Sequence, residues 1–294
     1  MTELRIGVIG IPGKWSTEAL ADAVEARTGF RLVVDMGQVA WNLDSGALWY
    51  QGTDLGDLDG LIIKKISEIY SPHVLDRLEM LRMAEARGVR VFSRPQNVLR
   101  LIDRLACTVS LRAAEIPMPP TVVTENAEAA HSALERFGVA VFKPLYSSKA
   151  RGMCVIDAAA PDASAQISAF AAQNPVMYIQ QKLELSGQDL GMVFLGGEYQ
   201  CTYARVGQSG SWNTTIHSGG KYAAYAPEPD LINLARKAQA PFGLDFTTVD
   251  VALTQTGPIV FEVSAFGGFR GAKEACGVDA ASLLVDHVIR RVVT

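Results

Sequence analysis

The stretch TTVDVALTQTGPIVFEVSAFGGFRGAKEACG, residues 247–277, places two carboxylates inside runs of residues that otherwise predict buried strands. Asp250 and Glu262 lie on consecutive strand candidates that the short segment TQTG joins, as in a hairpin. Antiparallel pairing allows both side chains to face one side of the sheet, within reach of a single metal ion. Magnesium prefers such oxygen ligands, together with water and phosphate oxygens. The alternative is that both charges lie on the solvent-exposed face of a hairpin.

A glycine-rich segment, SAFGGFRG (residues 264–271), follows the second of these strand candidates. Glycines allow the backbone to approach a ligand closely, and Arg270 is placed to meet an anion there. The alternative is that this segment is an ordinary flexible turn.

A basic loop follows another buried strand candidate in VFKPLYSSKARGM, residues 141–153. Lys143 ends that strand, and a phosphate is a reasonable partner for it because lysine is rarely buried alone. The loop carries Ser148, Lys149 and Arg151, which predict a cover for phosphate groups. The spacing of a Walker A loop is absent. The alternative is a solvated basic loop.

Two polar segments complete the candidate site. In MYIQQKL, residues 177–183, Gln180 and Gln181 follow apolar residues, as in one wall of an adenine pocket. The turn after it leads to Asp189. NTTIHSGGKY, residues 213–222, is polar and rich in glycine between strand candidates, which is typical of a binding loop.

The pattern of strands and helices changes along the chain. Over roughly the first 95 residues, strand and helix candidates alternate, which predicts a parallel sheet covered by helices, with Ser16 as the N-cap of the first helix. The segment NVLRLIDRLACTVSLRAAE, residues 97–115, predicts one helix that the prolines of IPMPPT end. Short strands with fewer helices follow. The fold class is therefore α/β followed by α+β.

The composition is that of a globular protein. The chain has 294 residues, of which 49% are hydrophobic and 20% charged, with a net charge of −4. This balance argues against a nucleic-acid partner bound by bulk charge. No apolar run is long enough to span a membrane, and no secretory signal is evident. The four cysteines are widely separated, which predicts reduced thiols in a cytoplasmic protein.

Taken in order, these segments resemble the ATP-grasp superfamily and, within it, the RimK-like α-L-glutamate ligase branch. The resemblance covers residues 60–290 and rests on eight segments in the correct order. They are RPQNVLRLIDRL, IPMPPT, VFKPLYSSKARGM, YIQQKL, QDLGMVF, NTTIHSGGKY, TVDVAL and VFEVSAFGGFRG.

The resemblance implies an ATP-grasp fold in three parts. An N-terminal α/β pre-ATP-grasp domain would occupy residues 1–96, a small subdomain residues 97–184, and a C-terminal subdomain residues 185–294. The implied activity is an ATP- and magnesium-dependent ligation, with Mn²⁺ as a possible substitute. The substrate carboxylate is phosphorylated to an acyl phosphate, which an amine then attacks.

The resemblance also assigns residues to roles. The implied metal ligands are Asp250, Glu262 and Ser264, and the implied catalytic residues are Lys143 and Arg270. The implied nucleotide-binding residues are Arg104, Lys143, Ser148, Lys149, Arg151, Gln181, Lys182, Leu183, Asp189 and Thr215.

Several of these positions differ from the family pattern. Arg104 replaces a lysine, Gly191 replaces an arginine that follows the ribose acid, and Thr215 replaces an asparagine. Ser264 replaces the asparagine of the Glu-x-Asn metal motif. The implied substrates are a small-molecule or peptide carboxylate and an amine, and a homo-oligomer is possible. Two alternatives stay open: an ATP-binding scaffold that has lost catalysis, and an ATP-grasp phosphotransferase.

Overall fold

The computed structural model describes residues 4–148, 150–207, 214 and 219–294. The first part of the chain forms a sheet with the strand order β2-β1-β6-β7, in which all neighbours are parallel. The predicted parallel sheet is therefore confirmed. Its strands are β1 (Ile6–Ile9), β2 (Val33–Val34), β6 (Gly60–Ile63) and β7 (Arg90–Phe92), and its helices are α1 (Trp15–Thr28) and α2 (His73–Ala86).

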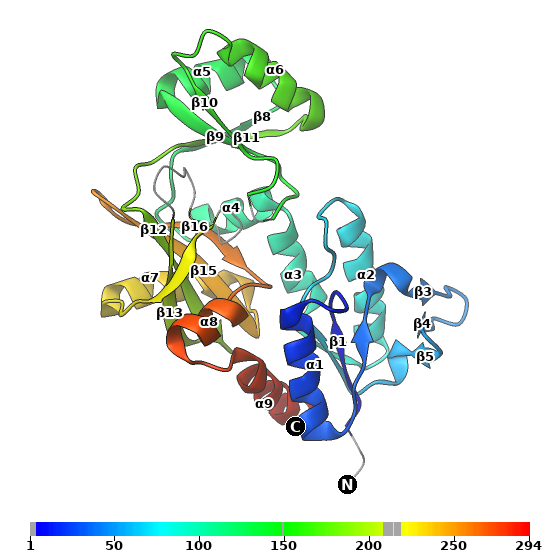
Figure 1. Cartoon of the computed structure of the whole chain (residues 1–294). Coiled ribbons are helices and arrows are strands. Elements are labelled where there is room, and N and C mark those ends of the chain that lie inside the picture. Colours follow the sequence, from blue (N-terminus) through cyan, green and yellow to red (C-terminus); the bar gives the residue numbers. More distant parts are fainter. Residues whose placement is uncertain (1–3, 149, 208–213, 215–218) are drawn as a thin grey trace.

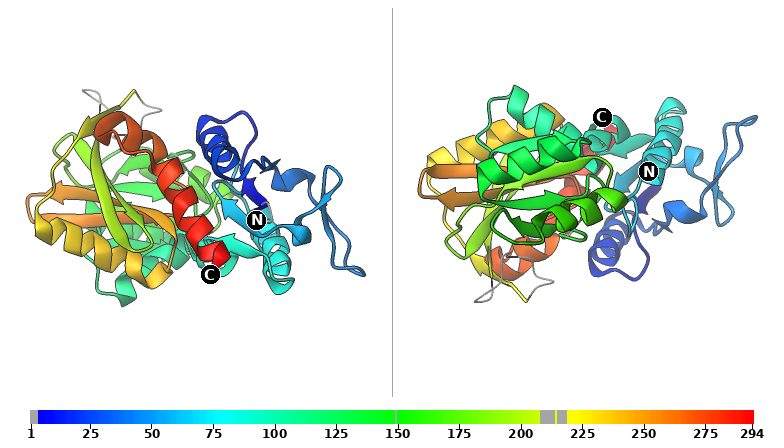
Figure 2. Two further views of the ribbon diagram at one scale, coloured as in Figure 1. Left: turned by 90° about the horizontal axis from the view of Figure 1, so that it is seen from below. Right: turned by 90° about the horizontal axis from the view of Figure 1, so that it is seen from above.

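The N-terminal part differs from expectation in two places. Helix α1 begins at Trp15 with Lys14 as its N-cap residue, so the predicted cap at Ser16 is wrong. A small antiparallel sheet projects from this part of the molecule (Figures 1 and 2), and its strands are too short to show a period in the sequence. It comprises β3 (Ala40–Trp41), β4 (Leu48–Tyr50) and β5 (Thr53–Asp54), flanked by short 3₁₀ turns at Met36–Gln38 and Leu55–Asp57.

The single helix predicted over residues 97–115 is two helices, so that prediction is wrong. Helix α3 (Pro95–Ile102) ends where Asp103 takes an extended backbone conformation, and α4 (Arg104–Ala113) begins directly after it. The Asp103 carboxylate accepts a hydrogen bond from the backbone N–H of Leu105 at 2.9 Å. A side-chain acceptor at this position caps the start of a helix. The break therefore makes Arg104 the first residue of α4.

The next segment forms a separate lobe, at the top of Figure 1. Its antiparallel sheet has the order β10-β9-β11-β8, and two helices cover one face. The lobe has its own buried cluster, which includes Leu134, Phe142 and Ile167. The elements are β8 (Thr121–Thr124), α5 (Ala127–Phe137), β9 (Val139–Lys143), β10 (Cys154–Asp157), α6 (Ala163–Gln173) and β11 (Met177–Gln181).

The last part of the chain is built on an antiparallel sheet with the order β14-β13-β12-β15-β16. The glycine-rich segment after β16 runs into helix α8, so its second half is helical instead of a turn. The strands are β12 (Gln188–Leu195), β13 (Glu198–Val206), β14 (Lys221–Ala224), β15 (Phe246–Thr254) and β16 (Gly257–Ser264). The helices are α7 (Pro229–Gln239), a 3₁₀ turn (Ala240–Phe242), α8 (Phe269–Cys276) and α9 (Ala280–Val293).

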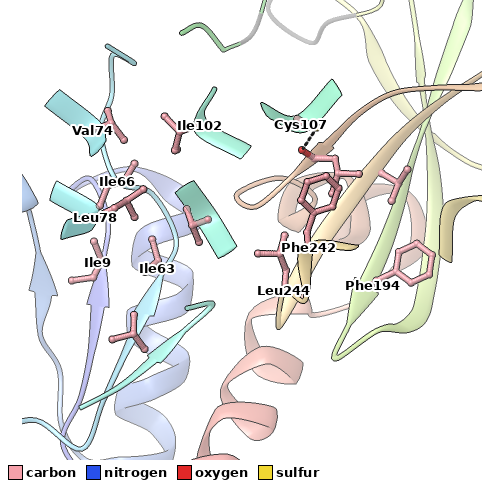
Figure 3. Packing of buried hydrophobic residues seen from close by; sticks show 14 of the residues in the cluster. Ile9, Ile63, Ile66, Val74, Leu78, Ile102, Cys107, Phe194, Phe242 and Leu244 are labelled. Atoms are coloured by element: carbon pink, nitrogen blue, oxygen red, sulfur yellow. Dashed lines mark hydrogen bonds between the residues drawn. The ribbon is translucent and has the colours of Figure 1, made fainter. Parts of the chain in front are cut away.

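The first and last parts of the chain share their cores. One buried cluster extends from Ile9 and Leu78 in the N-terminal layer to Phe194 in the large sheet (Figure 3). A second cluster packs α9 against α1 through Leu284 and Val24, among others. These parts are therefore joined by continuous apolar packing, whereas the lobe of β8–β11 has its own core. The domain boundaries at residues 96 and 184 stay predictions.

Candidate active site

A cavity with a volume of about 650 Å³ lies where the three parts of the molecule meet. Its walls include the ends of β6, β9 and β11, the start of α4, the strands β12, β13, β15 and β16, and the start of α8 (Figure 1). Most of the residues that the sequence singled out line this cavity. They are Arg104, Lys143, Ser148, Gln181, Lys182, Leu183, Asp189, Asp250, Glu262, Ser264 and Arg270.

Asp250 and Glu262 are direct cross-strand partners in the β15–β16 pair. Side chains of directly opposed residues on neighbouring strands point to the same face of a sheet. Both residues line the cavity, so the alternative of two charges on an exposed outer face of the hairpin does not apply.

Arg205, which the sequence reasoning missed, joins two of the predicted residues. Its guanidinium forms an ion pair with the Asp250 carboxylate at 3.0 Å and a two-pronged, hydrogen-bonded ion pair with Asp189. Thr214 also donates to Asp189. Asp189 and Arg205 are opposed across β12 and β13. The available signal was the alternation in EYQCTYARV, which places Arg205 on the same face as Tyr203.

Arg104 pairs with the Glu262 carboxylate, as Arg205 pairs with Asp250. Its guanidinium donates to Glu262 at 3.0 Å, to the carbonyl of Pro144 at 3.3 Å and to the hydroxyl of Ser147 at 3.3 Å. The side chain is only 10% exposed, so this arginine is fixed between α4, β16 and the loop after β9. Each proposed metal ligand of carboxylate type is thus paired with one arginine.

The oxygen atoms at this site suit a divalent cation. Burial raises the pKa of the Asp250 carboxyl; Arg205 lowers it, and the nearby Glu262 and Asp189 raise it further. A divalent cation bound beside this carboxyl would favour its charged form, because it would offset the cost of burial. Two carboxylates and a hydroxyl leave positions for water and phosphate oxygens, as magnesium prefers. Among the described residues, no group of three or more His, Cys, Asp or Glu side chains is arranged so that it could hold a metal ion by itself.

Ser264 ends β16 opposite Thr248. Its hydroxyl accepts a hydrogen bond from the backbone N–H of Phe266 at 3.3 Å, which shapes the start of the glycine-rich segment. The buried hydroxyl of Thr248 has no hydrogen-bond partner among the described residues. At Gly268, a Cβ atom would lie 2.6 Å from that hydroxyl, and its φ of 90° also favours glycine.

Lys143 lies at the end of β9 and donates to the side-chain carbonyl of Gln180. Burial lowers the pKa of Lys143 to about 7; Arg104 acts in the same direction and Glu262 opposes it. Gln180 in turn donates to the hydroxyl of Thr121 at 3.1 Å. Gln180 is only 2% exposed, so this buried side chain fixes the position of the Lys143 ammonium.

The end of β11 forms another wall. The backbone N–H groups of Gln181 and Lys182 donate to the carbonyls of Pro120 and Val139, both at 2.9 Å. These bonds fix the backbone, while the side chains of Gln181, Lys182 and Leu183 contribute to the cavity surface.

The basic loop after β9 is only partly directed into the cavity. Ser148 lines it, whereas Arg151 does not and instead donates to the carbonyl of Glu68 at 3.2 Å. That contact joins the loop to the N-terminal part of the chain. Lys149 and Thr215 lie outside the described residues.

Gly191, where the family pattern has an arginine, lies under an aromatic ring. It is opposed to Tyr203 across β12 and β13, and a Cβ at this position would lie 2.3 Å from a ring carbon of Tyr203. A side chain at residue 191 would displace that ring. The guanidinium in this region comes instead from Arg205, on the neighbouring strand.

The far end of the cavity is formed by the N-terminal part of the chain together with α8. Arg270 stacks over Trp15, with 5.3 Å between its guanidinium carbon and the ring centroid, and forms an ion pair with Glu274 at 3.5 Å.

Lys64 is the second residue that sequence reasoning missed. It directly follows β6 and is 4% exposed, and its ammonium donates to the carbonyl of Phe266 at 2.6 Å. The signal was a lysine at the end of the apolar run GLII, at the carboxyl edge of a parallel sheet.

Comparisons with known proteins bear on the family and the fold. A model of the RimK-like ATP-grasp domain matches residues 102–288. The tetrahydromethanopterin:alpha-L-glutamate ligase of Methanosarcina acetivorans is 24% identical over an alignment of 318 positions. The alignment covers 97% of this chain and 98% of that protein.

Two solved structures are similar over nearly the whole chain. The RimK domain ATP-grasp protein from Sphaerobacter thermophilus is 23% identical with a TM-score of 0.74, covering 97% of this chain and 99% of that one. The ATP-grasp ligase PsnB, solved with a phosphomimetic precursor variant, Mg and ADP, is 19% identical with a TM-score of 0.76, covering 99% of both chains. The predicted ATP-grasp fold is therefore confirmed. Within the described residues, none of the helices is both long and apolar enough to cross a membrane.

Proposed function

The chain belongs to the RimK-like ATP-grasp family, and on that premise we propose that it activates a substrate carboxylate with ATP and joins it to the amine of an amino acid. The predicted class of enzyme, an ATP-dependent ligase that forms C–N bonds, is confirmed at the level of the family. The family uses ATP and magnesium. The alternative of a scaffold that has lost catalysis is not supported.

One observation carries the proposal: the cross-strand pair Asp250 and Glu262 faces a cavity whose other wall presents Lys143. We assign Asp250, Glu262 and Ser264 to hold magnesium. When bound, the ion would neutralise phosphate charge and polarise the phosphoryl group under attack.

The chemical problem is the repulsion between a carboxylate and a triphosphate. Lys143, Arg104 and Arg205 line the same cavity as the proposed metal ligands and supply positive charge there, which lowers the cost of bringing two anions together. In this proposal, both arginines turn from the carboxylates to the reacting oxygens once substrates bind. An acyl phosphate then forms with release of ADP, and the amine displaces phosphate.

The nucleotide is assigned to the wall formed by Gln181, Lys182 and Leu183, with Asp189 toward its ribose. Ser148 and Arg151 belong to the proposed phosphate cover, as do Lys149 and Thr215. Support for glutamate as the amino acid comes from the name of the relative from Methanosarcina acetivorans. Use of Mn²⁺ and a homo-oligomer stay predictions from the family resemblance, and a cytoplasmic location stays a prediction from the widely separated cysteines.

The test is ADP formation with hydroxylamine present, which converts an acyl phosphate to a hydroxamate. A panel of carboxylates, each with ATP and magnesium, should yield ADP and hydroxamate together for the true substrate. Glu262→Gln should lower the rate by at least about a hundredfold, because it removes a charge from the reacting centre. Glu135→Gln, an exposed site on α5, is the matched control.

Other outcomes have definite meanings. Full activity in Glu262→Gln would refute the metal assignment. ADP together with a stable phosphorylated product, and no hydroxamate or amide, would instead favour a phosphotransferase.

A further inference from the structure

We propose that Tyr203 binds the terminal phosphoryl group of ATP, to which its hydroxyl donates a hydrogen bond. This inference rests on the proposed function and deepens it by adding a residue that the sequence patterns did not single out. Three observations carry it: the place of Tyr203 in the large sheet, the backbone against which its ring lies, and the lack of a partner for its hydroxyl among the described residues.

Tyr203 stands in one row with both carboxylates of the proposed metal site. On the large sheet, Tyr203 of β13 opposes Gly191 of β12, and Gly191 in turn opposes Asp250 of β15. The row ends with Glu262 of β16, which opposes Asp250. Directly opposed residues point to the same face of a sheet. The tyrosine ring and the Asp250 carboxylate therefore extend from the same face, with only a glycine between them, and both line the cavity.

The glycine between them makes room for the tyrosine ring. A Cβ at residue 191 would lie 2.3 Å from a carbon of the Tyr203 ring and 2.5 Å from its hydroxyl oxygen. The hydroxyl end of the ring therefore lies directly over the backbone of β12. Because β12 lies between β13 and β15, the ring leans towards β15 and brings its hydroxyl towards Asp250.

The ring is also held by the backbone of α8. A Cβ at Gly271 would lie 2.7 Å from each of three carbons of the Tyr203 ring. The ring of Tyr222 on β14 packs edge-on against it, with 5.3 Å between the ring centroids and 89° between the ring planes. Only 3% of Tyr203 is exposed. A donor that is fixed in this way needs no rearrangement when a phosphoryl group arrives.

The hydroxyl of Tyr203 forms no hydrogen bond with any other residue that the structure describes. Most buried polar atoms have a partner, so an unpaired hydroxyl in a cavity wall points to a ligand. A tyrosine hydroxyl keeps its proton near neutral pH, and burial raises the pKa of this one further. The group is therefore available as a donor, and its acceptor has to come from what fills the cavity.

The terminal phosphoryl group is the acceptor that suits this position. Asp250 marks where phosphate oxygens would lie, because magnesium takes some of its ligands from substrate phosphates. The proposed adenine wall is on β11, in the other lobe, so the last phosphoryl group of the nucleotide is the one that reaches furthest into the large sheet. A neutral hydroxyl there adds a hydrogen bond beside the charge that Arg205 already supplies.

The test compares the dissociation constants of two nucleotides, each measured by calorimetry with magnesium. AMP-PNP, a non-hydrolysable analogue of ATP, has the terminal phosphoryl group, and ADP lacks it. The variant is Tyr203→Phe, which removes the hydroxyl and keeps the ring. The matched control is Tyr199→Phe on the same strand, because the hydroxyls of Tyr199 and Thr202 are bonded at 2.9 Å and Tyr199 does not line the cavity.

We expect Tyr203→Phe to weaken the binding of AMP-PNP by at least about tenfold and to leave ADP within about twofold of the wild type, because the lost hydrogen bond has a charged acceptor that only AMP-PNP carries. Tyr199→Phe should leave both affinities unchanged. In urea without nucleotide, Tyr203→Phe should keep the unfolding midpoint of the wild type, because it loses no internal hydrogen bond. Tyr199→Phe should lower that midpoint.

An affinity for AMP-PNP that stays within about twofold of the wild type in Tyr203→Phe, or an equal loss for ADP, overturns the inference. A lower urea midpoint in Tyr203→Phe also overturns it, because the hydroxyl would then have a partner inside the folded protein. Failure of the wild type to bind either nucleotide overturns the proposed function, and the inference with it. Circular dichroism of both variants separates loss of binding from loss of fold.

Discussion

Arg205 holds two buried carboxylates that come from different strands of the large sheet. It pairs with Asp189 on β12 and with Asp250 on β15, and 19% of its side chain is exposed. A charge trio of this kind is stable only while every member is present, because an unpaired charge at such a site is costly. The same residue therefore serves both the stability of the sheet and the proposed reaction.

Replacement of Arg205 by Met should lower the free energy of unfolding by about 3–5 kcal/mol, because Asp189 and Asp250 would stay buried without a partner. Urea unfolding of the purified variant measures this. Arg82→Met is the control, since Arg82 pairs with Glu79 at a half-exposed site and its loss should cost less than about 1 kcal/mol. Equal costs for both variants would contradict the argument.

Lys64 makes stability depend on pH. Burial and the neighbouring Lys65 lower the pKa of Lys64 to about 7, while the unfolded chain keeps its proton to about pH 10.4. Between these values the unfolded state binds more protons, so stability rises with pH by up to about 1.4 kcal/mol per pH unit. Lys64→Met removes this rise. Lys143 has a similar shift, which cancels when the two proteins are compared.

The measurement is urea unfolding of wild type and Lys64→Met from about pH 6 to pH 9. The stability difference between the two proteins should grow in favour of the wild type above about pH 7. The exposed Lys237→Met should instead follow the wild type in parallel. A constant difference for Lys64→Met would show that its pKa is not lowered in the folded protein.

The carboxylates of the site could be predicted from the sequence, but their partners could not. Charged residues that interrupt apolar runs can be recognised in the sequence alone, as at Lys143, Asp250 and Glu262. The pairing of Arg104 with Glu262 joins residues 158 positions apart, and only the packing of α4 against β16 reveals it. Lys64 and Arg205 had local signals as well, but only the packing shows their partners; Phe266, which accepts from Lys64, is 202 positions away.

At the scale of elements, the break between α3 and α4 places a charge at the active site. Asp103 ends one helix and caps the next, which makes Arg104 the first residue of α4. The apolar residues keep a helical spacing from residue 97 to residue 115, so the sequence favours one continuous helix. The cap decides the outcome, because its carboxylate satisfies a backbone N–H that a continuous helix would bond elsewhere.

Asp103→Ala should lower the free energy of unfolding by about 0.5–2 kcal/mol through loss of the cap. It should also weaken the rise in melting temperature that ATP and magnesium produce, because Arg104 loses its fixed position. Asn126→Ala is a matched control: Asn126 caps α5 in the same way but lies far along the chain from Arg104. Its loss should lower stability while the ATP-dependent shift stays. Equal shifts in both variants would refute the role of the break.

At the scale of the whole molecule, the apolar cores divide the chain into two units of different size. The N-terminal layer and the large sheet share two clusters, whereas the lobe of β8–β11 has a cluster of its own. A unit with a separate core can open without disturbing the rest. We therefore expect the lobe that carries Lys143 and the basic loop to move relative to the proposed metal ligands.

Leu134→Ala and Leu78→Ala test this division, since both residues are at least 98% buried, one in each unit. Each should cost about 2–5 kcal/mol locally. Hydrogen exchange should speed up only within α5, α6 and their sheet in Leu134→Ala, but across both the N-terminal layer and the large sheet in Leu78→Ala. Faster exchange throughout the molecule in both variants would mean a single cooperative unit.

The order of strands and helices carried most of the information about architecture. The parallel N-terminal sheet and the hairpin of β15 and β16 follow from local patterns, and both were predicted. The projecting sheet of β3–β5 was not, because strands of two or three residues show no period. The packing of α9 against α1 was also invisible, since it joins the two ends of the chain.

The arginine–carboxylate pairs mean that the fold supplies its own counterions. In a small zinc domain the metal holds the chain together, so a chelator unfolds it. Here the guanidinium groups of Arg104 and Arg205 already balance Glu262 and Asp250. Binding of magnesium at the proposed site would then exchange one cation for another around Asp250 and Glu262. The fold would then be stable without the metal, and a chelator should not unfold it.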